Sequence, residues 1–165
     1  MNSLTDKYTL INSVEVPCIA FGTWKMPEEV AANAVKCAIE SGYRHIDTAA
    51  AYQNEEYVGK GIRESGVKRD EIFLVSKLPN DDHGYQNAID SCERSLKRLK
   101  TDYLDSYLIH WPVLVENVDR LEDDLCETWR AFEKLYNDGK LRSIGTSNFL
   151  EEHIEIIKRN FSTIL

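Results

Sequence analysis

The sequence lacks the features that mark several common classes of protein. Its formal net charge is −8, so it has no excess of the basic residues that bind nucleic acid or an anionic membrane surface. No apolar run approaches the ~20 residues of a membrane-spanning helix, and the stretch from Met1 to Lys7 contains no apolar signal-peptide core. These absences predict a protein with no nucleic-acid or membrane partner.

Cysteine is scarce, and its spacing forms no recognisable motif. The four cysteines stand singly, and no histidine lies at metal-ligand spacing from any of them. Cys37, Cys92 and Cys126 fall inside helical patterns, which predicts buried and unreactive thiols. We therefore expect no metal site and a reducing, cytoplasmic location.

A glycine-rich dinucleotide loop is also missing. The nearest match, the stretch from Gly59 through Gly61 to Gly66, has the wrong spacing and falls inside a helical pattern. The 165 residues are enough for one hydrophobic core, and no linker divides them. The sequence therefore predicts a single domain over residues 1–165 that is not a doubly wound dinucleotide fold.

The sequence does contain a regular alternation of strands and helices. A hairpin is expected around Asn12 and Ser13. Five strand–helix units follow, with expected strands at 17–22, 44–47, 71–77, 103–110 and 141–147, and expected helices at 27–41, 55–64, 85–99, 121–138 and 151–159. This alternation indicates a parallel sheet, and a period of about 30 residues fits a barrel unit. We therefore expect an α/β fold that is part of a (β/α)8 barrel, with one incomplete domain.

Polar residues stand at the carboxyl ends of four expected strands. They are Asp47, Lys77, His110 and the pair Ser147 and Asn148. In a barrel these ends converge on one pocket. The sequence therefore predicts that these side chains share one site.

Tyr52, just beyond the second strand, could supply a proton at that site. A free phenol has a pKa of about 10, and a nearby ammonium such as that of Lys77 favours the phenolate. Asp47 could keep Lys77 in place and charged, and His110 could hydrogen-bond a substrate carbonyl oxygen. Each residue also has a plain structural interpretation, as a turn, strand-end or packing residue.

Three motifs resemble those of the aldo-keto reductase family, and the resemblance extends over residues 5–160. They are GYRHIDTA at 42–49 with Glu55, Val58 and Gly59 at set spacing, LIHWP at 108–112, and IGTSNF at 144–149. Thr146 departs mildly from the usual aliphatic residue. The motifs are most similar to those of microbial diketogluconate reductase-like members.

The resemblance implies an NADPH-dependent reductase of aldehydes and ketones on a (β/α)8 barrel. It implies a catalytic tetrad, cofactor contacts and substrate contacts. The tetrad is Asp47, Tyr52, Lys77 and His110, the cofactor contacts are Gly22, Thr23, Asp47, Ser147 and Asn148, and the substrate contacts are Trp24, His110 and Trp111. Ser147 and Asn148 would hold the nicotinamide carboxamide, and no residue in the sequence decides between NADP and NAD.

The chain has about five of the family's eight units, which predicts a truncated product with an incomplete cofactor site. Two alternatives to a working reductase remain open. Lys77 could form a Schiff base in a lyase. The chain could instead be an inactive remnant or an assembly partner that self-associates through unpaired sheet edges.

Overall fold

A hairpin precedes the main sheet. The computed structural model describes residue 4 and residues 6–112 and 119–162. β1 (Lys7–Thr9) pairs antiparallel with β2 (Glu15–Pro17), and the turn between them is closed by the bond from Leu10 N to Val14 O. The hairpin predicted from the sequence is therefore confirmed.

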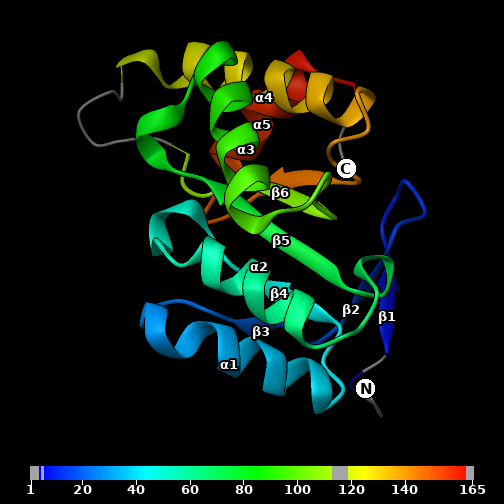
Figure 1. Cartoon of the computed structure of the whole chain (residues 1–165). Helices are drawn as coiled ribbons and strands as arrows, with labels where there is room; N and C mark the ends of the chain where they lie inside the picture. The colour runs from blue at the N-terminus through cyan, green and yellow to red at the C-terminus, as the bar shows by residue number, and fades with distance from the viewer. Residues whose placement is uncertain (1–3, 5, 113–118, 163–165) are drawn as a thin grey trace.

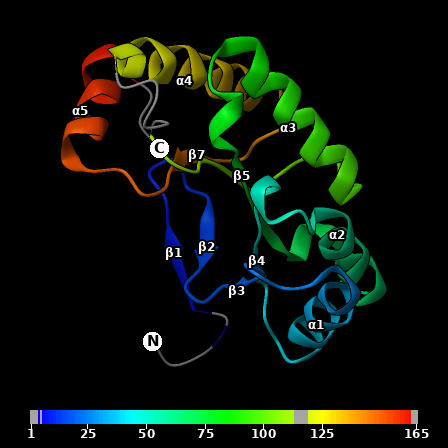
Figure 2. The same ribbon diagram turned by 90° about the vertical axis from the view of Figure 1, so that its left-hand side faces the viewer.

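The main sheet has five parallel strands in chain order. They are β3 (Phe21–Gly22), β4 (His45–Asp47), β5 (Phe73–Leu78), β6 (Ser106–Ile109) and β7 (Ile144–Thr146). Each strand is followed by a helix: α1 (Glu28–Glu40), α2 (Glu55–Glu64), α3 (Tyr85–Leu99), α4 (Leu121–Asn137) and α5 (Glu151–Asn160). Figure 1 shows these helices beside their strands, and Figure 2 shows them following one another around the outside of the sheet. This is the architecture of a partial (β/α)8 barrel.

The core lies between the sheet and the helices. Tyr107 and Ile109 on β6 are fully buried, whereas Leu108 and His110, which alternate with them, are partly exposed. Successive strand residues point to opposite faces, so the helix-facing side of the sheet forms the core. The other side is less covered and carries the polar strand ends.

Gly59 and Gly61, two glycines of the stretch that resembles a dinucleotide loop, let neighbouring helices pack closely. A Cβ on Gly59 would lie 2.2 Å from the Leu99 carbonyl oxygen, and one on Gly61 would lie 2.4 Å from that of Ala32. Such distances are possible only without a side chain, so α2 meets its two neighbouring helices through its backbone. These glycines serve helix packing, in agreement with the sequence-based rejection of a phosphate loop.

Some predictions of detail were wrong. The first parallel strand was expected over 17–22 but begins at Phe21, because Pro17 belongs to the hairpin. Cys37 is exposed, since it lies on the outer side of α1, while Cys92 and Cys126 are buried as predicted. Burial raises the pKa of Cys92 to about 12, which keeps that thiol protonated.

The described helices offer no candidate for a membrane span. None of them combines the length and the apolar composition that crossing a bilayer would require.

Candidate active site

The register of the sheet brings an acid and a lysine together. Asp47 at the end of β4 pairs with Val75, so Lys77 lies two residues further along β5 on the same face. The Lys77 Nζ donates to Asp47 Oδ1 at 2.6 Å and to the Thr48 carbonyl oxygen at 2.8 Å. The lysine side chain is only 7 % exposed, so these acceptors replace the water that its ammonium loses.

Tyr52 approaches this ion pair from a short 3-10 helix, Ala50–Tyr52. The next residue, Gln53, has φ 58°, and this left-handed conformation ends the turn before α2 begins. The phenol oxygen lies 3.4 Å from Lys77 Nζ, within hydrogen-bond reach of the ammonium. A positive charge thus stands beside the hydroxyl group of Tyr52.

His110 completes the group from the end of β6. Its backbone N–H bonds to Leu78 O at 3.3 Å, and its ring meets the Tyr52 ring edge-on with centroids 5.7 Å apart. Burial, and then the nearby Lys77 charge, lower the pKa of His110 below its usual 6.5. The imidazole is therefore neutral at neutral pH, with one N–H to donate.

Ser147 and Asn148 follow β7 at the same end of the sheet. The Ser147 N–H donates to Ile109 O at 2.8 Å, and the Asn148 side-chain amide donates to His110 O at 2.8 Å. Asn148 adopts φ 58°, so its backbone turns sharply after the strand. The pair is thereby fixed beside His110.

The residues predicted near β3 are placed differently from one another. Gly22 is exposed, and an added Cβ there would meet no atom within 4 Å. Thr23 is fully buried, and its hydroxyl donates to the Asp47 carbonyl oxygen at 3.2 Å. Trp24 and Trp111 are exposed beyond the ends of β3 and β6. The structure therefore gathers Asp47, Tyr52, Lys77 and His110 closely and leaves the two indole rings at the surface.

The sequence did not single out Asn54 and Glu55 as site residues, although both are buried at the start of α2. Glu55 accepts hydrogen bonds from Ser76 Oγ and from Arg98 Nε, each at 2.6 Å. Two signals were available: Glu55 belongs to the first of the three family motifs, and both residues stand at the start of a helix, where Asn and Glu are common for reasons of capping. A place at a helix start predicts a capping role, and it does not predict the buried hydrogen bonds that Asn54 and Glu55 make.

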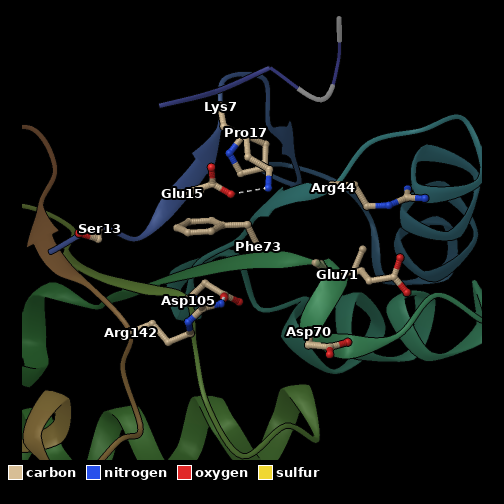
Figure 3. Close-up of a pocket in the computed structure, with 11 residues that line it drawn as sticks. Lys7, Ser13, Glu15, Pro17, Arg44, Asp70, Glu71, Phe73, Asp105 and Arg142 are labelled. Carbon is tan, nitrogen blue, oxygen red and sulfur yellow. Dashed lines mark hydrogen bonds and ion pairs between the residues drawn. The ribbon is translucent and has the colours of Figure 1, made fainter. Parts of the chain in front are cut away.

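A pocket of about 640 Å³ lies at the opposite end of the sheet, under the hairpin. Figure 3 shows Phe73 between the hairpin and the Asp105–Arg142 pair, with Lys7 and Glu15 joined on the hairpin. The Lys7–Glu15 and Arg142–Asp105 distances are both 2.7 Å, so these lining charges already have partners. In barrels the amino ends of the strands serve stability, and this pocket lies far along the sheet from the tetrad.

The comparisons with known proteins agree with this fold. Residues 18–164 match the pattern of the aldo/keto reductase family. This chain belongs to the aldo/keto reductase family, whose similar members carry the names of reductases and dehydrogenases.

Individual relatives and structures show how far the likeness extends. The chain is 52 % identical over 154 residues to glyoxal reductase of Bacillus subtilis, covering 93 % of this chain and 53 % of the relative. It is 47 % identical to the 9,11-endoperoxide prostaglandin H2 reductase of Trypanosoma cruzi, covering 93 % and 52 %. The crystal structure of a Bombyx mori aldo-keto reductase in complex with NADP matches with a TM-score of 0.88 at 36 % identity, covering 98 % and 56 %. The chain thus spans about half the length of the relatives that it matches.

Proposed function

We propose that this chain carries the proton-transfer site of a nicotinamide-dependent carbonyl reductase, which reduces aldehydes and ketones to alcohols. One observation carries the proposal: a phenol, an ammonium and a carboxylate lie in contact, with a neutral imidazole against the phenol ring. This arrangement fits the donation of a proton to a carbonyl oxygen.

The roles of the four residues follow from this geometry. The His110 N–H donates a hydrogen bond to the substrate carbonyl oxygen, which polarises the carbonyl group. Tyr52 then transfers its proton to that oxygen as hydride reaches the carbonyl carbon. The Lys77 ammonium stabilises the phenolate that remains, and Asp47 keeps the ammonium charged.

The proposed cofactor is NADP, which when bound supplies the hydride. Its presence in the similar Bombyx mori structure favours this choice over NAD. The Asn148 NH₂ group already donates to His110 O and Ser147 Oγ, so the Ser147 hydroxyl would supply a donor and Asn148 Oδ1 an acceptor, which fits the nicotinamide carboxamide. Gly22 leaves room for a bound group near β3, while the buried Thr23 acts through its bond to Asp47.

A Schiff-base lyase fits the structure less well. A lysine that attacks a carbonyl group must lose its proton. Lys77 instead donates to the Asp47 carboxylate and to the Thr48 carbonyl oxygen, which stabilise its charged form.

An assembly role has one observation in its favour. Within residues 6–112 and 119–162, β3 and β7 each pair with a single strand of the sheet. Unpaired edges invite association with another chain. Sedimentation velocity measures this directly, and a monomer at all concentrations would count against it.

The reductase proposal predicts that Tyr52→Phe strongly lowers turnover. Loss of a positioned proton donor lowers kcat by about 10²–10⁴. The measurement is NADPH oxidation by the purified chain with glyoxal or nitrobenzaldehyde as substrate. Tyr85→Phe, at an exposed tyrosine on α3, is the matched control and should retain full activity.

Two results would contradict the proposal. If the wild-type chain oxidises no NADPH, the proposed reductase activity of this chain is wrong, and only the arrangement of the four side chains remains. A Tyr52→Phe variant as active as Tyr85→Phe would remove the phenol from the mechanism.

A further inference from the structure

Asn54 occupies the position just before α2 but does not cap the helix. An asparagine there normally accepts a hydrogen bond from an N–H of the first turn, which stabilises a helix by about 1 kcal/mol. The Asn54 side chain makes no such bond and is 0 % exposed. Its amide group is directed to other parts of the chain.

Both ends of that amide are used. The Asn54 Nδ2 donates to Thr23 O at 2.8 Å and to Met26 O at 3.2 Å, while Oδ1 accepts from Thr48 Oγ1 at 3.1 Å. The Met26 N–H also donates to Thr23 O, closing the turn that carries Trp24. One side chain therefore ties the turn after β3 to the segment after β4.

The residues that Asn54 holds are direct neighbours of the ion pair. The Thr48 carbonyl oxygen accepts a hydrogen bond from Lys77 Nζ at 2.8 Å. Thr23 donates to the Asp47 carbonyl oxygen through both its N–H and its hydroxyl, at 3.0 and 3.2 Å. Asn54 is thus linked to Lys77 through Thr48 and to Asp47 through Thr23.

We infer that Asn54 is a positioning residue, which fixes the Trp24 turn and the Thr48 carbonyl oxygen relative to Tyr52 and Lys77. Its catalytic meaning rests on the proposed reductase function. Tyr52 lies two residues before Asn54, so the phenol, the turn and the lysine acceptor all share one anchor. The role extends to the substrate side of the site, because the anchored turn presents Trp24.

The chemistry of the contacts requires an amide at this position. Two carbonyl oxygens face Nδ2, so that atom must be a donor, and a hydroxyl donates to Oδ1, so that atom must be an acceptor. A carboxylate is not compatible with this arrangement, because Asn54→Asp would set an acceptor oxygen against the two carbonyl oxygens. The variant has nearly the same shape, so it tests the hydrogen bonds and not the volume.

Amide hydrogen exchange tests the placement without any need for turnover. In Asn54→Asp, exchange at the N–H groups of Thr23, Met26 and Thr48 should accelerate at least about tenfold, which corresponds to about 1.4 kcal/mol of local stability. Exchange along α3 should match that of Asn33→Asp, a control with the same change at an exposed position on α1. An equal acceleration along α3 would mean a general loss of stability, and no local acceleration would mean no anchor; either result overturns the inference.

Kinetics then test whether the anchor matters for catalysis. With an active wild-type chain, Asn54→Asp should lower kcat for aldehyde reduction at least about tenfold, while Asn33→Asp leaves it unchanged. Accelerated exchange together with an unchanged kcat would overturn the positioning role. If the wild-type chain oxidises no NADPH, the reductase proposal fails, while the exchange result still decides whether Asn54 holds the turn.

Discussion

Two carboxylates form ion pairs at opposite ends of the same sheet, and their surroundings differ. At the carboxyl end, Asp47 is 29 % exposed and accepts from Lys77. At the amino end, Asp105 is 1 % exposed and accepts from Arg69, Arg142 and the Leu74 N–H at 2.7–3.0 Å. One carboxylate is partly open to solvent, and the other is enclosed by donors.

The two clusters differ in whether a group that could react stands beside the ion pair. The donors around Asp105 bond either the carboxylate or nearby backbone oxygens, so the cluster holds separate segments of the chain together and places no phenol or imidazole beside the acid. The Asp47 cluster also includes a phenol and a neutral imidazole whose protons are not required by the ion pair. An ion pair at a strand end therefore indicates a reactive site only when such a group stands beside it.

The largest expected effect is on stability, from matched substitutions of the two acids. Asp105→Asn places an NH₂ group against an arginine or against the Leu74 N–H, and should lower the free energy of unfolding by about 3 kcal/mol. Asp47→Asn can keep its oxygen toward Lys77, which also bonds the Thr48 carbonyl oxygen, and it should cost about 1–2 kcal/mol. Urea denaturation of both variants measures the two values, and equal losses would mean that the enclosure of Asp105 adds nothing.

A smaller effect should distinguish the two arginines of the amino-end cluster. Arg69 is 23 % exposed and also donates to Ile72 O and Tyr103 O, while Arg142 is 47 % exposed. Arg69→Met should therefore cost about 2 kcal/mol and Arg142→Met about 1 kcal/mol or less. The same denaturation assay applies, and a larger loss for Arg142→Met would reverse the assignment.

The smallest effect concerns the titration of two histidines, one toward each end of the sheet. Burial is the main cause that lowers the pKa of both His110 and His45. Lys77 is the next cause for His110 but the weakest for His45, so Lys77→Met should raise the pKa of His110 more. NMR titration of the ring protons measures both values, and equal shifts would contradict the placement of Lys77 beside His110.

The sign of the associated pH dependence follows from the lowered pKa. Above about 6.5 His110 is neutral in both the folded and the unfolded state, and its contribution to stability is fully present. As the pH falls from about 6.5 toward the lowered pKa of the folded state, the unfolded chain binds the proton before the folded chain does, and stability is lost. A His110→Gln variant should lose less stability than the wild type between pH 6.5 and more acidic conditions.

The sequence predicted the grouping of the candidate site's residues because parallel strands bring their carboxyl ends together. Asp47, Lys77 and His110 each follow an apolar run, and a regular strand–helix alternation places such ends side by side. The helix limits were also predictable: α2 and α3 begin and end where the spacing of apolar residues indicated.

Other features depend on contacts between distant segments. Asn54 has the local signature of a helix cap, and only its buried contacts show a different use. Asp105 is bound by arginines 36 and 37 residues away, which no local pattern links to it. Cys37 lies within an amphipathic helix, and its spacing alone did not separate the inner from the outer side of α1.

The bare backbone of α2 has a consequence for how this site can vary. At Gly59 and Gly61 the helix touches its neighbours with nothing between the main chains. Any substitution there adds atoms, and the added Cβ would push α2, whose first turn follows Tyr52, away from its neighbouring helices. The position of the helix that follows Tyr52 thus depends on two residues that carry no side chain at all.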